Sequence, residues 1–402
     1  MHRLESLCHQ GEQDAAGVDF QVKPGREAGF FLLNCSYGPA NIAKILLLLI
    51  NDKALDIVGI MSTRSVPDIY EHIRAKLNAP NVCFLFGAGS SKCVGYPLMS
   101  ELTQIALDKA KSKPDVSGVM KKLSGCTIEE QLEELFGQLR SPGLSKLDEH
   151  VMRETVEHIY DVIFEECSKI AILNHHKKFV RSIYGRMGER KRFHIFTTNY
   201  DMLFEWACDH ELIHCINGFL GVQCRIYDPN QFDIRPARII QTRRSGASAR
   251  LFPCFCLYKL HGSVSWITDG ITIKEVQLTP GAKRQYGQLM VFPTPQKYSE
   301  TYKTPYMDMF TRMRDILSTK QTVLITHGFG FADAHIKPMI EQCLNDNTFI
   351  LIVISKDMLT SFESFKYNKN VSIITEDVTI IGGKEYSINN NIWDFSNFVN
   401  LI

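Results

Sequence analysis

The sequence predicts an α/β protein with a doubly wound parallel sheet and a helical insertion. Mainly apolar runs without polar alternation, such as Val82–Phe86 and Thr322–Thr326, are typical of strands buried on both faces. Segments with helical spacing of apolar residues separate these runs, which favours a parallel sheet covered by helices. Each run also ends in a glycine-rich or polar loop, so we expect these loops to gather at the carboxyl edge of the sheet.

The stretch Val82–Pro97 is the first of these units. An apolar strand leads into the turn Gly87–Gly89, and a helical pattern follows. Glycines let the backbone turn sharply and approach a ligand, while Ser90 and Ser91 add hydroxyl and amide groups. The stretch is therefore a candidate phosphate-binding loop; the alternative is a glycine turn that only lets a helix pack on the sheet. The dinucleotide fingerprint is incomplete, because Gly95 comes six residues after the second glycine rather than three.

Composition is that of an ordinary globular protein. The chain has 402 residues, 45% of them hydrophobic, and a net charge of +1, so no global field attracts nucleic acid or an anionic membrane. Twelve cysteines without C-x-x-C spacing indicate a reducing compartment. No apolar run approaches the ~20 residues of a membrane span, and the start has no signal-peptide pattern. We expect a cytoplasmic protein without direct nucleic-acid or membrane contact.

The chain divides into three parts. Residues 1–65 form an N-terminal extension, and two interpretations of it are open: a segment with little role in the fold, or a docking arm for an oligomer. Regular patterns begin at Val66, and residues 66–378 are expected to form the main domain. Residues 379–402 are a C-terminal tail with aromatic residues that could dock on a neighbour.

Two segments interrupt the strand pattern of the main domain. A helical insertion is expected at about 103–190; it includes a capping box at Thr127–Glu130 and a helix over Val151–Ile172. The His175–His176 pair within it is expected on the surface rather than at a metal.

A loop-rich segment is expected at about 210–255. Its basic part, Gln241–Arg250, is predicted to be an exposed loop. The pair Arg243–Arg244 could touch phosphate, although a solvated loop is the simpler interpretation. Cys254 and Cys256 share one strand face without a second cysteine pair, which argues against a zinc site.

Four further strand ends carry polar groups. These are Thr197–Asp201, His261–Ser263, His327–His335 and Ser355. The carboxyl ends of parallel strands meet at one edge, so we expect an asparagine, two aspartates and several histidines to share one crevice with Gly87–Ser91.

These motifs, in this order, resemble the sirtuin family and more closely its bacterial sirtuin-like branch in anti-phage defence. Gly87–Ser91 and Gly95–Pro97 are similar to the Gly-Ala-Gly-x-Ser turn and the Gly-x-Pro that follows it. Thr197–Asp201 resembles the Thr-Gln-Asn-x-Asp loop, with threonine in place of glutamine, and His261–Gly262 resembles the catalytic His-Gly. Gly328–His335 resembles the glycine-aromatic-Asp-x-His element of the sirtuin-like branch.

Two departures from deacylating sirtuins limit this resemblance. Leu98–Ser100 replaces their Asp-Phe-Arg, and the four-cysteine zinc module is absent, since Cys343 is the only cysteine beyond Cys256. Both argue against acyl-lysine chemistry, and the missing cysteines argue against a bound zinc. The resemblance extends over roughly residues 66–375.

The resemblance implies a Rossmann-like domain that binds NAD⁺ as its substrate and hydrolyses it. Asn199 would position the attacking water or the ribose, and His261 would act as general base on the ribose hydroxyls. Asp333 and His335 also have a structural interpretation, because an aspartate before a helix is a natural cap. The residues expected to bind the cofactor are Gly87, Ala88, Gly89, Ser90, Ser91, Pro97, Thr198, Asp201, Gly328, Phe329, Gly330, Asp333, His335 and Ser355.

The resemblance also implies a biological role and partners. The function it implies is an NAD⁺ glycohydrolase that depletes NAD⁺ in anti-phage defence, held silent in a homo-oligomer or by a partner such as a HerA-type ATPase. Two alternatives are open: an NAD-dependent protein deacylase, and a non-catalytic NAD or ADP-ribose sensor in a complex with a DNA-translocase-type ATPase.

Overall fold

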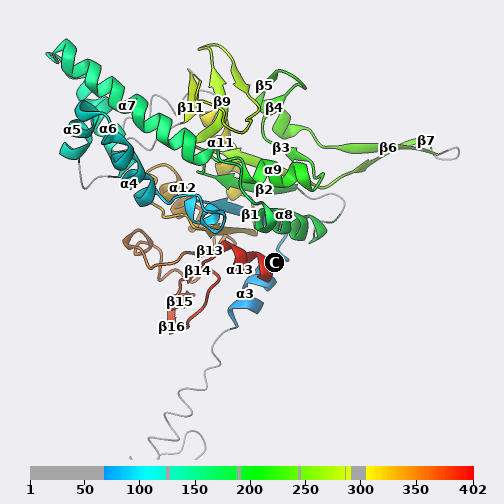
Figure 1. Ribbon diagram of the computed structural model, residues 1–402. Coiled ribbons are helices and arrows are strands. Elements are labelled where there is room, and N and C mark those ends of the chain that lie inside the picture. Colours follow the sequence, from blue (N-terminus) through cyan, green and yellow to red (C-terminus); the bar gives the residue numbers. More distant parts are fainter. Residues whose placement is uncertain are drawn as a thin grey trace, which may run out of the picture. The chain divides into compact units, whose positions relative to one another are not determined.

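In the part of the chain that the structure describes, the main sheet has nine strands in the order β16-β15-β14-β13-β12-β1-β2-β8-β3 (Figure 1). The computed structural model describes residues 68–123, 127–186, 188, 192–242, 246–285, 287–290 and 305–402, so the extension predicted for residues 1–65 lies outside the described residues. The strands of this sheet are β1 (Asn81–Phe86), β2 (Arg192–Thr197), β3 (Cys215–Ile216), β8 (Cys254–Lys259), β12 (Thr322–His327), β13 (Ile350–Ile354), β14 (Val371–Ile374), β15 (Val378–Ile381) and β16 (Lys384–Ser387).

The strand order confirms the predicted doubly wound fold. The first strand, β1, lies in the middle of the sheet. The strands β2, β3 and β8 follow on one side of it, and β12, β13 and β14 follow on the other side. All of these strands pair in parallel, whereas β15 and β16 add antiparallel pairs at one edge. The winding direction therefore changes between β1 and β12, the position where open α/β sheets bind ligands.

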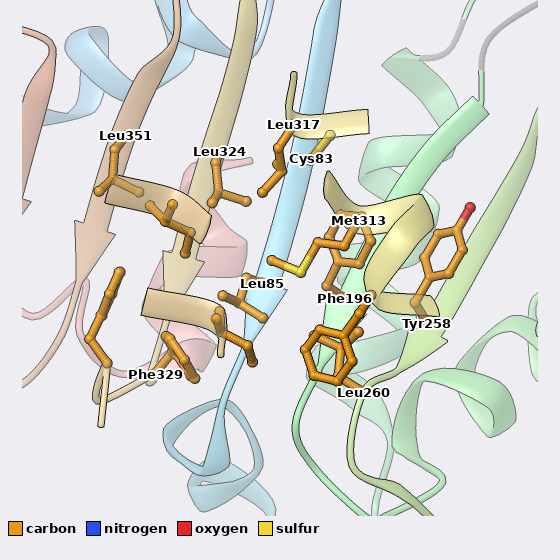
Figure 2. Packing of buried hydrophobic residues seen from close by; sticks show 14 of the residues in the cluster. Cys83, Leu85, Phe196, Tyr258, Leu260, Met313, Leu317, Leu324, Phe329 and Leu351 are labelled. Carbon is orange, nitrogen blue, oxygen red and sulfur yellow. The ribbon is translucent and has the colours of Figure 1, made fainter. Parts of the chain in front are cut away.

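Helices cover both faces of the sheet. Alternate residues of β1 point to opposite faces: Cys83 and Leu85 pack against α11 (Tyr306–Leu317) and α12 (Ile336–Cys343), as Figure 2 shows for Met313 and Leu317 of α11. The other face packs against four helices, namely α3 (Ile69–Lys76), α8 (Asn174–Arg186), α9 (Leu203–His210) and α13 (Phe395–Leu401). Burial on both faces explains why the central strands are apolar without alternation.

The predicted helical insertion has its own core. Four helices pack on one another: α4 (Met99–Ala110), α5 (Pro114–Lys122), α6 (Ile128–Leu139) and α7 (Lys146–Cys167). The predicted capping box is present, because Thr127 Oγ1 accepts from Glu130 N at 3.3 Å and Glu130 Oε2 accepts from Thr127 N. None of the helices in the described part of the chain is long and apolar enough to cross a membrane.

The segment expected to be loop-rich contains short strands. A second sheet has the order β11-β9-β10-β5-β4, with β4 (Phe219–Leu220), β5 (Arg225–Tyr227), β9 (Gly262–Thr268), β10 (Ile273–Glu275) and β11 (Gln288–Met290). The described residues on either side of the Arg243–Arg244 pair form the hairpin strands β6 (Ala237–Thr242) and β7 (Gly246–Leu251) rather than an irregular loop. The Arg243–Arg244 pair itself lies outside the described residues. The described side chains of this hairpin are mostly exposed. The sequence therefore lacks the alternation of apolar and polar residues by which a half-buried strand is predicted.

The C-terminal residues belong to the main fold. β15 and β16 extend the sheet, and Phe395 and Phe398 of α13 are fully buried in the chain's own core, where we expected aromatic residues docking on a neighbour. The surface position predicted for the His175–His176 pair is wrong for His176. Its ring is buried beside Phe204 and Phe395, with centroid distances of 5.1 and 4.7 Å, and burial lowers its pKa to about 3.

Candidate functional site

The loops that follow β12, β1, β2 and β8 meet at one edge of the sheet. Backbone hydrogen bonds join each loop to its neighbour: Gly87 N donates to His327 O (3.1 Å), Thr198 N to Phe86 O (3.1 Å), and Leu260 N to Thr197 O (2.9 Å). The topology therefore brings all four predicted motifs to the carboxyl edge, beside the point where the winding direction changes.

The two glycine loops at this point are in backbone contact. A Cβ atom on Gly87 would lie 2.4 Å from Gly328 O, and one on Gly89 would lie 2.6 Å from Gly328 Cα. Gly328 has a φ of +62°, in the left-handed region that favours glycine. These three glycines are therefore required by the packing of the loops on each other.

The glycine loop also satisfies several of its own polar groups. Gly89 N donates to Gly328 O at 3.1 Å, and Ser90 N and Ser90 Oγ both donate to Gly87 O. Instead of a helix of α type, the 3₁₀ segment η1 (Ala88–Val94) follows Gly87. Phosphate binding by the amides of Gly87, Gly89 and Ser90 would require these bonds to be exchanged.

Asn199 is held by this glycine loop. Its side-chain amide, in a residue only 9% exposed, donates to Gly87 O (3.1 Å), Ser90 Oγ (3.3 Å) and Ser91 Oγ (2.9 Å). Ser91 Oγ donates in turn to Asp201 Oδ2 at 2.8 Å. Asn199, Ser91 and Asp201 thus form a connected network between the loops after β1 and β2, as expected from a shared site.

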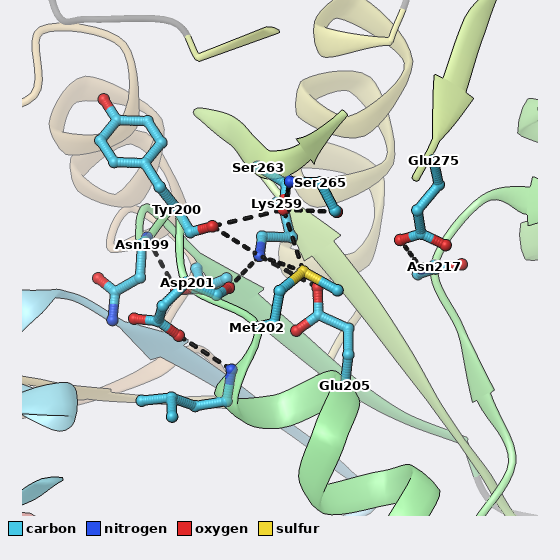
Figure 3. A network of polar contacts seen from close by, with 12 residues as sticks. Asn199, Tyr200, Asp201, Met202, Glu205, Asn217, Lys259, Ser263, Ser265 and Glu275 are labelled. Atoms are coloured by element: carbon cyan, nitrogen blue, oxygen red, sulfur yellow. Dashed lines mark hydrogen bonds and ion pairs between the residues drawn. The ribbon is translucent and has the colours of Figure 1, made fainter. Parts of the chain in front are cut away.

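A buried lysine contacts the loop after β2 (Figure 3). Lys259, the last residue of β8, is 1% exposed, and its ammonium group donates to the carbonyl oxygens of Tyr200 (3.3 Å) and Asp201. It also forms an ion pair with Glu205 Oε1 of α9 at 3.0 Å. Sequence reasoning missed Lys259, although a lysine next to the end of an otherwise apolar strand was a usable signal.

The charges around Lys259 are not balanced. Its one ammonium group interacts electrostatically with the buried carboxyl groups of Asp201 and Glu205, and also with that of Glu275, which is paired with Arg225. Burial raises the pKa of both Asp201 and Glu205, and Lys259 opposes the rise. The pKa of Glu205 is raised to about 7, so this carboxyl group binds and releases a proton near neutral pH.

His261 is held by the loop after β12. Its Nε2 atom lies 2.9 Å from Asp333 Oδ2, and the two residues are 5% and 6% exposed. Asp333 Oδ1 accepts from the backbone N–H groups of His335 and Ile336, both at 2.8 Å, at the start of α12. The structural interpretation of Asp333 as a helix cap is therefore confirmed, and a contact with His261 accompanies it.

The structure gives other predicted cofactor residues mainly structural contacts. Phe329 is buried in the core, Gly330 O accepts from Ser361 Oγ, and Ser355 N pairs with Ile374 O. Pro97 immediately precedes the N-cap of α4, and Thr198 is partly buried.

The two predicted catalytic side chains have separate partners. Asn199 is tied to the loop after β1, whereas His261 is tied to the loop after β12. The loops after β1 and β12 are themselves in contact through Gly87, Gly89 and Gly328. These glycine contacts therefore link the loop that holds Asn199 to the loop that holds His261.

No group of three or more His, Cys, Asp or Glu side chains suited to a metal ion occurs among the described residues. Cys254 and Cys256 are both buried in β8, and the pKa of Cys256 is raised by the neighbouring Cys254 and by burial.

Part of this edge is similar to a known domain family. Residues 194–374 match the SIR2-like domain. This SIR2-like segment contains Asn199, His261 and Asp333, and it begins after the glycine loop Gly87–Ser91. Comparison with curated proteins finds no match.

Several solved structures of Sir2 proteins align with most of the chain. A Sir2 homologue in complex with ADP-ribose is 14% identical, with 82% of this chain and 96% of that chain covered and a TM-score of 0.39. A Sir2 homologue in complex with NAD is 11% identical, with 83% and 94% covered and a TM-score of 0.35. Sir2 in complex with EX-527, 2′-O-acetyl-ADP-ribose and deacetylated p53 peptide is 12% identical, with 82% and 97% covered and a TM-score of 0.40.

Proposed function

We propose that this chain hydrolyses NAD⁺ to nicotinamide and ADP-ribose. The observation that carries the proposal is the pairing of the two predicted catalytic side chains with loops at one sheet edge: Asn199 with Ser91, and His261 with Asp333. Both side chains belong to the SIR2-like segment. The edge adjoins the change in winding direction, where α/β sheets bind nucleotides.

Hydrolysis of NAD⁺ depends more on a ribose held in a fixed position than on a strong nucleophile. The bond between C1′ of the ribose and nicotinamide breaks with its electron pair leaving on the nicotinamide nitrogen, and the oxygen of water bonds to C1′. The water loses one proton to solvent. Because the amide N–H groups of Asn199 already donate to the glycine loop, its Oδ1 is the atom that would accept a hydrogen bond from this water. His261 would act as general base on the ribose hydroxyls.

The other predicted cofactor residues keep supporting roles in this proposal. Asp201 would orient Asn199 through Ser91, and Ala88, Pro97, Thr198, Gly330, His335 and Ser355 would line the nucleotide. A deacylase is disfavoured by the sequence, which lacks the four-cysteine zinc module. A sensor without catalysis would need neither Asn199 nor His261.

Incubation with NAD⁺, together with a binding measurement, distinguishes these three functions. Purified protein is mixed with NAD⁺, with and without an acetyl-lysine peptide, and the products are separated by chromatography. A hydrolase yields nicotinamide and ADP-ribose without the peptide, whereas a deacylase yields nicotinamide only with it. Calorimetric binding of NAD⁺ without turnover, even with an activating partner, would identify a sensor and refute the hydrolase.

We further propose that the protein acts in the cytoplasm as an anti-phage effector that depletes NAD⁺. Such an activity must be silent in healthy cells, and the proposed control is assembly into a homo-oligomer or with a HerA-type ATPase. The test is to compare NAD⁺ levels in infected cells that carry the wild-type gene or the His261→Ala gene. Sedimentation of the purified protein tests the oligomer, and equal NAD⁺ levels in both strains would contradict the effector role.

A further inference from the structure

The contact between His261 and Asp333 joins loops that the sheet holds far apart. In the strand order, β1 and β2 separate β8 from β12. Adjacent strands lie about 4.8 Å apart, so the ends of β8 and β12 are separated by three spacings, or about 14 Å. The distance of 2.9 Å between Nε2 and Oδ2 therefore means that the loop 328–335 and the His261 side chain together span the ends of β1 and β2. Those ends carry the glycine loop and Asn199.

The backbone of this loop is held in a strained conformation. Phe331 has a φ of +54°, which costs a residue with a side chain on the order of 1–2 kcal/mol. Its ring is 1% exposed and packs with Phe329, Phe362 and Phe365 at centroid distances of 4.9, 5.7 and 5.2 Å. This aromatic packing fixes the loop two residues before Asp333. The strain is typical of segments that hold a functional group in place.

The two oxygens of Asp333 have different tasks. Oδ1 caps α12 through the N–H groups of His335 and Ile336, which fixes the carboxyl group relative to a regular element. Oδ2 is directed at His261 Nε2. A carboxylate only accepts hydrogen bonds, so Nε2 carries the proton in a neutral imidazole and the basic lone pair lies on Nδ1.

We infer that Asp333 is a positioning residue that fixes the tautomer of His261 and makes Nδ1 the basic atom of the site. This assignment rests on the proposed hydrolase and deepens it. It differs from the cofactor contact that the sequence suggested for Asp333, because the carboxyl group is occupied by the cap and by the histidine. The task of Asp333 is to keep the imidazole oriented and its proton on the far nitrogen.

Asp333→Asn is the sharpest test. Asparagine is an equally good helix cap, so Oδ1 can still accept from His335 and Ile336. Its NH₂ group faces Nε2 and donates, which requires the proton of His261 to move to Nδ1, so that Nδ1 no longer has a basic lone pair. We expect kcat to fall on the order of 10²- to 10⁴-fold, while KM for NAD⁺ changes less than about threefold. A rise in KM with kcat unchanged would instead assign Asp333 to cofactor binding and overturn the inference.

Asp68→Asn is the matched control. Asp68 Oδ1 also accepts from two backbone N–H groups at a helix start, those of Tyr70 (2.8 Å) and Glu71 (3.2 Å), but this side chain is not paired with a histidine in the described contacts. Nicotinamide release by this variant should equal that of the wild type. Asp333→Ser retains a capping hydroxyl and lacks the second oxygen, so it should lose kcat as well, because His261 is no longer oriented.

A nitrogen-15 spectrum of the His261 ring tests the inference without any turnover. The wild type should show the proton on Nε2 and the Asp333→Asn variant should show it on Nδ1; the same tautomer in both would overturn the inference. If the wild type releases no nicotinamide while the two tautomers differ, the proposed hydrolase fails and the positioning role stands. If the wild type is active and Asp333→Asn is equally active, the positioning role fails and the hydrolase stands.

Discussion

Replacing Glu205 by glutamine should change the stability of the protein in a pH-dependent way. The Glu205 carboxyl group is buried against Lys259, and its pKa is raised from 4.5 to about 7 mainly by burial. A folded-state pKa above the unfolded value means that folding favours the protonated form. The contribution of Glu205 to stability is therefore fully present below pH 4.5 and is lost as the pH rises from 4.5 to 7.

The magnitude follows from the size of the shift. About 2.5 pH units at 1.36 kcal/mol each give a penalty of about 3 kcal/mol for folding with the ionised carboxylate. Glutamine resembles the protonated acid and does not pay this penalty. We expect Glu205→Gln to have nearly the wild-type free energy of unfolding at pH 4.5 and to exceed it by about 3 kcal/mol at pH 8.

The assay is urea unfolding of both proteins between pH 4.5 and 8, with the variant-minus-wild-type difference plotted against pH. Subtraction removes the titration of all other groups. The control is Glu211→Gln, because the hydrogen bond from Arg181 lowers the pKa of Glu211, so that difference should have the opposite sign. A flat difference for Glu205→Gln, or a loss of stability at pH 8, would refute the claim that burial outweighs the ion pair with Lys259.

Two further predictions concern the loops at the sheet edge, and a third concerns the buried histidine of α8. Gly328→Ala should destabilise the protein more than Gly95→Ala in thermal unfolding, since both have positive φ but only the first Cβ would strike backbone, at 2.5 Å; equal losses would contradict the loop contact. Ser91→Ala should lower kcat for NAD⁺ about tenfold or more with a small loss of stability, because it disconnects Asn199 from Asp201; an unchanged kcat would show that this link is not needed. His176→Leu should raise the unfolding midpoint at pH 5 more than at pH 8, because the buried ring has a pKa of about 3 and stability is lost as the pH falls below 6.5; equal shifts would contradict its burial as a neutral group.

Local sequence patterns were sufficient to predict the central sheet. β1 and β12 are buried on both faces, so their apolar runs stand out, and the glycines after them mark the loops that meet at the edge. The hairpin β6–β7 was missed because its exposed strands have no hydrophobic alternation. The C-terminal segment was set apart as a tail, since short antiparallel strands such as β15 are recognised by their pairing more than by composition.

The sequence was sufficient to predict which loops form the candidate site, but not which side chains contact one another within it. The motifs indicated which residues reach the sheet edge, because strand ends follow from the strands. The contact between His261 and Asp333 joins residues 72 positions apart through a strained turn at Phe331, and nothing local specifies that path. Lys259 was overlooked for a related reason: its partners, Glu205 and the carbonyl groups of Tyr200 and Asp201, come together only in the folded chain.

The most direct test of the proposed hydrolase is the rate of nicotinamide release from NAD⁺ by the wild type, Asn199→Asp and His261→Ala, each with its fold verified by circular dichroism. We predict release by the wild type, with its activating partner if one is required, and a loss on the order of 10²-fold or more in each variant. Asn199→Asp preserves the size of the side chain but places a carboxylate oxygen against Gly87 O, where the wild type has a donating NH₂ group. The side chain is then no longer held by the glycine loop, so its Oδ1 should no longer be held in place to accept from the water. Wild-type rates in both variants would contradict the assignment of Asn199 and His261 to the reaction.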